Sequence, residues 1–276
     1  MRIQGLFVVA ESWLNDASEN ETRGKLLSFY MLISLGSMAS GQLMLNISPP
    51  SSFGPFIMIS VLVSLAVVPI LVSVGKTPSF ESAESVSIRQ LFLVSPLGVV
   101  GMLVGSIAMG TIFGMGAVYA SSIGLSVQEI SFFMASIIAG GAVMQFPLGQ
   151  MSDVFGRRLI IIGICLVGAL ASLFASHFSG SGWQLYAVTA LVGGLSTPLY
   201  SLCVAHTNDY LSQPQMVAAS GTLVLVSGIG AAIGPPVTAF AMEQLGSLAF
   251  FYSIAVSLGL VAIFGLWRST RRVAVA

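Results

Sequence analysis

Long apolar runs dominate this sequence and restrict what it can fold into. Eight segments of predominantly apolar residues recur along the 276-residue chain, each close to the roughly 20 residues that a helix needs to cross the hydrocarbon core. They show no two-residue alternation, and within lipid only helices and closed barrels satisfy every backbone polar group. The segments are 25–46, 53–75, 91–118, 128–149, 158–177, 183–206, 215–242 and 247–267. We therefore predict an all-α polytopic membrane protein with eight full transmembrane helices.

Composition supports the membrane prediction and excludes several functions. Hydrophobic residues make up 55% of the chain and charged residues 7%, whereas ordinary soluble domains are about one quarter charged. The formal net charge is zero, so there is no electrostatic basis for binding nucleic acid. Cys165 and Cys203 lie inside apolar runs and are interpreted as small buried residues, with a disulfide between them as the alternative. With no metal-ligand cluster, P-loop or nucleophile elbow in the sequence, we predict no enzymatic activity, no cofactor and no metal site.

The basic residues predict the orientation of the chain in the lipid bilayer. Of the 10 Lys and Arg residues, nine fall in alternate connections between the apolar segments. These nine are Arg23, Lys25, Lys76, Arg89, Arg157, Arg158, Arg268, Arg271 and Arg272. Short cytoplasmic loops carry the excess of positive charge in membrane proteins. We expect these connections and the C-terminus to be cytoplasmic.

One connection carries a recognisable motif. Residues 149–158 read G-Q-M-S-D-V-F-G-R-R, which resembles the loop signature of the major facilitator superfamily (MFS), found between helices 2 and 3 and, more weakly, between helices 8 and 9. Four apolar segments follow the motif, so the resemblance makes the eight segments helices 5 to 12 of a twelve-helix fold. The apolar segment 3–13 has half the needed length and would be the end of helix 4. The strings at 11–15 (E-S-W-L-N) and 206–210 (H-T-N-D-Y) are similar to the YcaD-like branch of the family.

The resemblance implies a domain organisation and a function. Residues 1–75 would be the remnant of an N-terminal bundle that lacks helices 1–3 and part of helix 4. Residues 76–90 would be the cytoplasmic inter-domain loop, and residues 91–276 the C-terminal six-helix bundle. The implied function is secondary transport of a small solute by alternating access in a bacterial cytoplasmic (inner) membrane. Protons as coupling ion, a facilitator without coupling, and a truncated fragment that does not transport remain open. A channel or a membrane-embedded enzyme would need polar or charged constellations that the sequence lacks.

The motif also implies a gate. Its residues are Gly149, Asp153, Gly156, Arg157 and Arg158. In the family this aspartate braces the start of a helix in the opposite domain, and by pseudo-symmetry Asp153 would face the start of 25–46. A carboxylate at a helix N-terminus is stabilised by the helix dipole, and the glycines would permit a tight turn and close approach. The alternative is that the arginine pair only anchors the topology.

Few polar side chains lie deep within the apolar segments. In the family, helices 7, 8 and 10 line the central cavity, so the resemblance suggests four substrate-lining candidates, with interhelical hydrogen bonding as the alternative role. They are Tyr119, Gln145, Ser196 and Tyr200. His206 with Asp209 could form a protonation site or, alternatively, a cap for the following helix.

The segment 215–242 contains a glycine-proline pattern. Gly221, Gly230, Gly234 and Pro235 follow the order G-x8-G-x3-G-P, which is similar to the antiporter motif of helix 5 in the family. Here the pattern falls in helix 11, and the segment 25–46, which would be helix 5, has no proline, so antiport is not supported. Small residues let membrane helices approach closely, and proline bends them. We interpret the pattern as a helix-packing motif.

Overall fold

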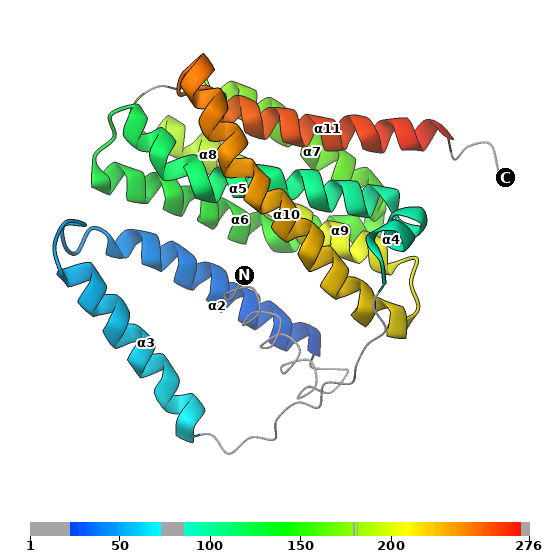
Figure 1. Ribbon diagram of the computed structural model, residues 1–276, viewed down its shortest axis with the longest axis horizontal. Coiled ribbons are helices and arrows are strands. Elements are labelled where there is room, and N and C mark those ends of the chain that lie inside the picture. The colour runs from blue at the N-terminus through cyan, green and yellow to red at the C-terminus, as the bar shows by residue number, and fades with distance from the viewer. Residues whose placement is uncertain (1–22, 73–85, 179, 181, 272–276) are drawn as a thin grey trace. The chain divides into compact units, whose positions relative to one another are not determined.

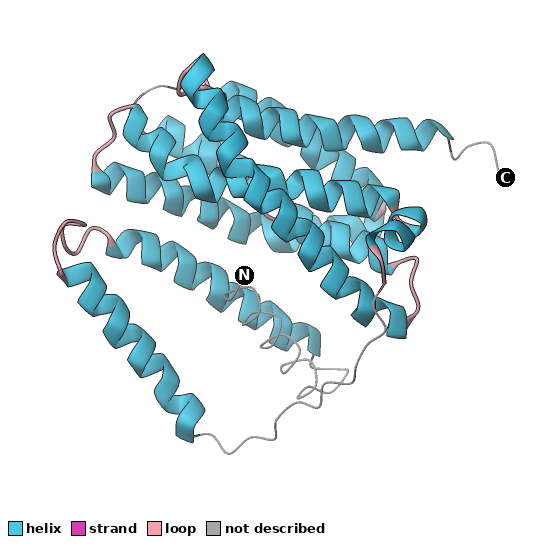
Figure 2. Ribbon diagram, in the orientation of Figure 1, coloured by secondary structure: helices cyan, strands magenta, loops and turns pink. Residues whose placement is uncertain are grey.

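The computed structural model describes residues 23–72, 86–178, 180 and 182–271, and every regular element among them is an α-helix (Figure 2). The predicted all-α class is thus confirmed. The chain divides into two compact units, Met1–Ser82 and Ala83–Ala276. The apolar segment 3–13, predicted to be the end of a helix, lies outside the described residues.

The described part of unit 1 consists of two helices. They are α2 (Arg23–Met44), which begins two residues before the predicted segment 25–46, and α3 (Gly54–Val72), which falls within the predicted segment 53–75. Among the described residues, neither helix is one of the candidate membrane spans, and the described apolar stretch of α3 is Gly54–Pro69.

Unit 2 contains all six candidate membrane spans of the described residues, so the helix count differs from the predicted eight. A short helix, α4 (Ile88–Val94), precedes them (Figure 1). The remaining helices are α5 (Pro96–Ser122), α6 (Val127–Phe155), α7 (Arg157–Ala175), α8 (Trp183–Ser196), α9 (Leu199–Asn208), α10 (Gln213–Leu245) and α11 (Ala249–Arg271). Helices α8 and α9 together form one span, Trp183–Asn208.

Two predicted segments are interrupted by proline. The segment 91–118 is divided at Ser95, because Pro96 disfavours the helical conformation in the residue before it and stands at the first position of the next helix. The segment 183–206 is divided between Ser196 and Leu199, where Pro198 lacks the N–H that would continue the ladder. Proline therefore starts a new helix in one span and breaks the helix in the middle of another.

The helices of unit 2 pack in pairs, with α5 against α10, α6 against α8, and α7 against α11 (Figure 1). The first pair is held by small residues. A Cβ atom added at Gly230 or Gly234 of α10 would collide with the backbone of α5, whereas one added at Gly221 would meet nothing within 4 Å. The buried hydroxyls of Thr111 and Thr238 are hydrogen-bonded across the same interface at 2.8 Å. Close approach and an interhelical hydrogen bond are what stabilise helix pairs in lipid, where no hydrophobic effect drives association.

Candidate functional site

The motif at residues 149–158 lies within helical structure. Helix α6 continues through Gly149 and Asp153 to Phe155, and α7 begins at Arg157. The turn is made by Gly156 alone, whose φ of +90° favours glycine. The predicted turn role of Gly149 is wrong, because this residue is helical and a Cβ there would meet nothing within 4 Å among the described residues.

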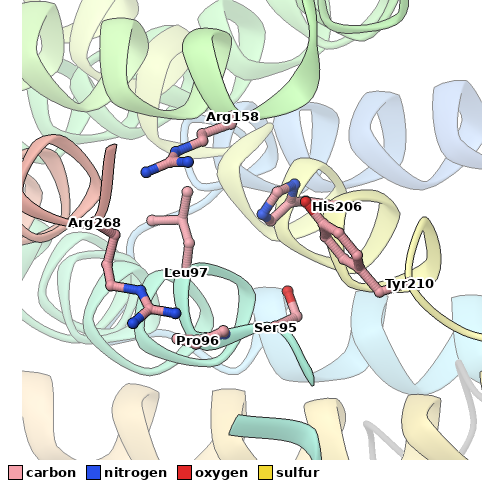
Figure 3. Close-up of a pocket in the computed structure, with 7 residues that line it drawn as sticks. All are labelled: Ser95, Pro96, Leu97, Arg158, His206, Tyr210 and Arg268. Atoms are coloured by element: carbon pink, nitrogen blue, oxygen red, sulfur yellow. The ribbon is translucent and has the colours of Figure 1, made fainter. Parts of the chain in front are cut away.

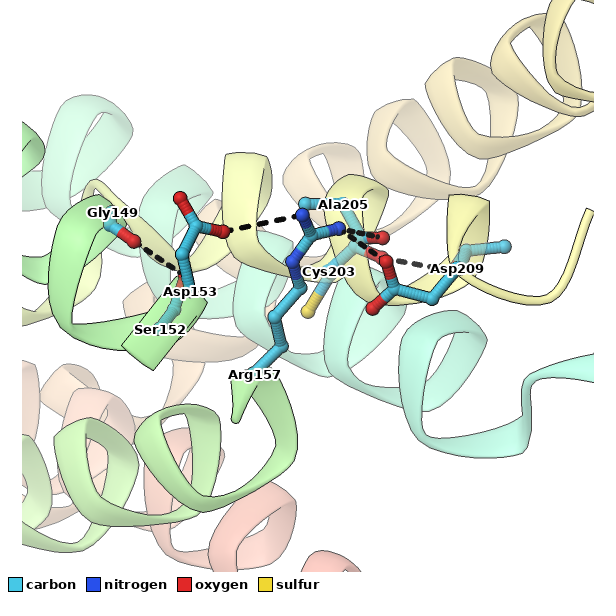
Figure 4. A network of polar contacts seen from close by, with 8 residues as sticks. Gly149, Ser152, Asp153, Arg157, Cys203, Ala205 and Asp209 are labelled. Carbon is cyan, nitrogen blue, oxygen red and sulfur yellow. Dashed lines mark hydrogen bonds and ion pairs between the residues drawn. The ribbon is translucent and has the colours of Figure 1, made fainter. Parts of the chain in front are cut away.

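Arg157 is the centre of a polar network that joins three helices (Figure 4). Its guanidinium donates to Asp153 of α6 at 3.3 Å and to Asp209 at 2.7 Å. It also donates to the carbonyl oxygen of Ala205 in the last turn of α9. A cation at a helix C-terminus satisfies a terminal carbonyl and interacts favourably with the helix dipole. The arginine thus ties the end of α6 and the start of α7 to the end of α9, which is more than topology anchoring requires.

Asp209 has a different role from the one predicted. It is the C-cap residue of α9, and its N–H donates to Ala205. The following helix, α10, is capped by Ser212, whose backbone N–H donates to Oε1 of Gln215 at 3.0 Å. The prediction that His206 and Asp209 cap the following helix is therefore wrong. His206 is buried, with its ring edge-on to Tyr210 at 5.3 Å between centroids.

The neighbouring arginine contacts another helix. Arg158 donates from Nη2 to the carbonyl oxygen of Gly265 in α11 at 3.3 Å. Arg268 of α11 lines one cavity with Arg158, and Arg157 lines an adjoining one. These three arginines lie at one end of unit 2, which we call the arginine end. At the start of α7, Arg157 bonds to the C-cap residue of α9, and Arg158 bonds to α11.

The structure separates the four substrate-lining candidates. Tyr119 is fully buried, and its ring stacks on Phe250 at 4.8 Å and packs edge-on to Phe251 at 5.0 Å. Gly105 of α5 lines the cavity at the break between α8 and α9 together with Leu199. Tyr119 lies fourteen residues further along α5, about 21 Å away by the helical rise. Tyr119 therefore belongs to the packed core of the bundle and presents no surface to a solute here.

The other three candidates lie on α6 and around the break between α8 and α9. Ser196 is 1% exposed, and its hydroxyl has no hydrogen-bond partner among the described residues. Ser196 and Tyr200 both line a cavity of about 10 Å³ against α5, which is about the room for one water. Gln145 donates to the hydroxyl of Ser201 at 2.9 Å, joining α6 to α9.

Sequence reasoning missed Ser201, Ala205 and the role of Asp209. Gln145 and Ser201 are 56 positions apart, and Arg157 and Asp209 are 52 positions apart. No local sequence pattern predicts that either pair is in contact. The proline at 198 was the available signal, because a break in a membrane helix exposes backbone that needs polar partners.

The described residues were searched for groups of side chains that could ligate a metal ion. Within residues 23–72, 86–178, 180 and 182–271, no group of three or more His, Cys, Asp or Glu residues could hold a metal ion. The described cysteines, Cys165 and Cys203, are both buried and free.

Comparison with known proteins identifies similar sequences. The profile described as "Major Facilitator Superfamily" matches residues 97–275. The chain is 28% identical over 271 residues to the "Uncharacterized MFS-type transporter YcaD" of Escherichia fergusonii, covering 96% of this chain and 69% of that protein. It is 28% identical over 255 residues to the "Uncharacterized MFS-type transporter Ent638_1421" of Enterobacter sp. (strain 638), covering 91% and 65%. The chain thus spans about two thirds of the length of these curated relatives.

Proposed function

Because the chain belongs to the major facilitator superfamily, we propose that it serves the transport of a small solute across a bacterial inner membrane by alternating access. The observation that carries the proposal is the interrupted span α8–α9, next to the unpartnered hydroxyl of Ser196. In secondary transporters, interrupted helices near the middle of the membrane supply polar groups to the bound solute. Such transport requires no covalent chemistry from the protein.

We assign solute contact to polar side chains around this break. Two of them, Ser196 and Tyr200, lie on either side of the break and line one cavity. The third, Gln145, lies on α6, which is hydrogen-bonded to α9 through this side chain. Their groups are hydroxyls and an amide, which favours an uncharged or zwitterionic polar solute that exchanges hydrogen bonds with them. The described spans place no carboxylate at this level, so proton coupling would fall to residues at the arginine end or outside the described part of the chain.

Units 1 and 2 are proposed to derive from the two bundles of the family, with residues 76–90 as their cytoplasmic link. The arginine end of unit 2 would then face the cytoplasm, as the charge distribution predicts. Asp153 is proposed to act in gating. Its side chain is 67% exposed despite the ion pair with Arg157, which leaves a carboxylate oxygen available for a further partner. Its contact with the start of 25–46 remains a prediction.

Cysteine labelling tests alternating access. Cys165 and Cys203 are both 0% exposed, so background labelling should be low. In inverted and right-side-out vesicles, a cysteine at Tyr200 should react with a membrane-impermeant maleimide from either side. The control is a cysteine at Leu170, which is 58% exposed on α7 and is expected to face lipid and remain unlabelled. Labelling of the Tyr200 position from one side only would contradict alternating access.

Two further measurements test the solute and the gate. Uptake and efflux of radiolabelled sugars, zwitterionic amino acids and a hydrophobic cation should single out one class, and the Gln145→Leu substitution should reduce its flux. If no class is moved, the transport proposal fails for this chain. Asp153→Asn should shift the ratio of inner to outer labelling at Tyr200→Cys, and an unchanged ratio would remove Asp153 from the gate.

A further inference from the structure

Two cavities adjoin at the arginine end of unit 2 and share part of their lining. The larger has a volume of about 420 Å³ and the smaller about 20 Å³. Both are lined by Arg158, His206 and Tyr210, which come from α7, α9 and the turn after α9. The smaller cavity continues to the start of α5 and to Arg268 of α11 (Figure 3). These elements converge on a space that the transport proposal does not use.

The deepest polar group in this space is Ser95. It is 1% exposed, and its hydroxyl has no hydrogen-bond partner among the described residues. Although Ser95 is the N-cap of α5, its side chain does not bond to that helix. In Figure 3 the hydroxyl points into the space that Leu97 and His206 border. A buried hydroxyl without a partner is uncommon, and an acceptor oxygen in the cavity would satisfy it.

The charge around the cavities is positive. Three arginines line them, against one aspartate. That aspartate, Asp209, is already paired with Arg157. Arg268 makes no hydrogen bond or ion pair within the described part of the chain, and Arg158 bonds to the carbonyl oxygen of Gly265. The guanidinium of Arg268 therefore has no acidic counterpart among the residues that line the space.

Two helix N-termini add to the positive potential. The 27-residue α5 begins beside the smaller cavity, and the 19-residue α7 begins in the wall of the larger one. Neither has a side-chain cap, because Ser95 does not bond and the N-cap of α7 is Gly156. The first N–H groups of a helix lack intrahelical partners and attract anions.

We propose that these adjoining cavities form a binding site for a phosphate-bearing anion, the headgroup of an anionic lipid or soluble phosphate. Guanidinium groups bind phosphate oxygens with paired, charge-assisted hydrogen bonds. Arg158 and Arg268 supply these donors, and the Ser95 hydroxyl supplies a neutral one. The lipid source suits the location, because the site lies at the ends of membrane-spanning helices, where lipid phosphates lie. This proposal does not depend on transport.

The test titrates the purified full chain in neutral detergent with dihexanoylphosphatidylglycerol, with dihexanoylphosphatidylcholine as the uncharged probe. Binding is measured by calorimetry at fixed ionic strength. Arg268→Gln should weaken phosphatidylglycerol binding about tenfold, which corresponds to the loss of one charge-assisted hydrogen bond. The matched control is Arg89→Gln, since Arg89 is an exposed arginine of α4 that lines neither cavity. It should leave the affinity unchanged.

Competition with sodium phosphate distinguishes the two sources. If phosphate displaces the lipid, and Arg268→Gln weakens both, the site takes the phosphate group itself. If the lipid binds and phosphate does not compete, the site is specific for the lipid headgroup. Ser95→Ala provides a second variant that removes only one hydroxyl and should weaken binding less than Arg268→Gln. Equal weakening by Arg89→Gln and Arg268→Gln, or no saturable binding of either probe, would overturn the proposal.

Discussion

Alanine at Gly234 tests the close packing of α10 on α5. A Cβ atom at this position would lie 2.8 Å from the backbone nitrogen of Thr111 and 3.1 Å from the carbonyl carbon of Gly110, whereas ordinary contacts begin at 3.4 Å. Backbone atoms cannot rotate out of the way as side-chain ends do. The two helices must therefore separate locally, which also weakens neighbouring contacts such as the Thr111–Thr238 hydrogen bond.

The expected magnitude follows from a comparison within the same helix. Gly221 is exposed, and a Cβ there would meet nothing within 4 Å. Both substitutions gain the same helix propensity, up to about 1 kcal/mol for Gly to Ala. This gain therefore cancels when the free energies of unfolding of the two variants are compared. What remains is the cost of overpacking, about 1–3 kcal/mol. Gly221→Ala should leave the free energy of unfolding unchanged or raise it. The free energy of unfolding of Gly234→Ala should be about 1–3 kcal/mol lower than that of Gly221→Ala.

We would measure this difference in free energy of unfolding by reversible unfolding in mixed micelles. The mole fraction of sodium dodecyl sulfate is increased stepwise, and circular dichroism reports the loss of helix. Both variants are compared with the unsubstituted chain under the same conditions. If Gly234→Ala is as stable as Gly221→Ala, the two helices do not approach as closely as described, and the interpretation of the glycine-proline pattern as a packing motif fails.

Three other perturbations have expected outcomes in the same unfolding assay. Arg157→Gln and Asp209→Asn should be non-additive in a double-mutant cycle by about 0.5–1 kcal/mol, because the pair is partly exposed to solvent. Thr111→Val or Thr238→Val alone should cost about 1 kcal/mol, since each leaves a buried hydroxyl unpaired, and the double variant should cost less than the two together. Gly156→Ala should destabilise by about 1–2 kcal/mol, because φ is +90° there.

Controls separate these effects from general damage. Gly163→Ala in the middle of α7 is the counterpart of Gly156→Ala, since a Cβ there would meet nothing within 4 Å and the residue is helical. Strict additivity of the Arg157 and Asp209 substitutions would show that the ion pair contributes nothing to stability. A threonine pair whose double variant costs the full sum would likewise argue against the hydrogen bond between α5 and α10.

The sequence predicted where helices exist better than where they end. The segment 128–149 was predicted to stop where polar residues begin, yet α6 continues to Phe155. Polar side chains such as those of Ser152 and Asp153 end an apolar run without ending a helix, because the helical hydrogen bonds belong to the backbone. The helix ends only at Gly156, where the dihedral angles leave the helical region.

The candidate site was predictable in its residue types but not in its partners. The motif pointed to Arg157, and the rarity of deep polar residues pointed to Gln145 and Ser196. Which groups they contact depends on the packing of helices far apart in sequence, as the pairing of Arg157 with Asp209 shows. The side chain of Ser95 illustrates the same limit, because Ser-Pro predicts a helix start but not a buried hydroxyl without a partner.

The link between α6 and α7 consists of one residue, Gly156. A single residue contributes two rotatable backbone dihedral angles, so the end of one helix and the start of the next remain at a nearly fixed separation. Neither helix can slide along its axis without carrying the adjoining end of the other with it. Any rearrangement of this helix pair is therefore a tilt about one point, and a small change of angle at that point becomes a large displacement at the far ends of both helices.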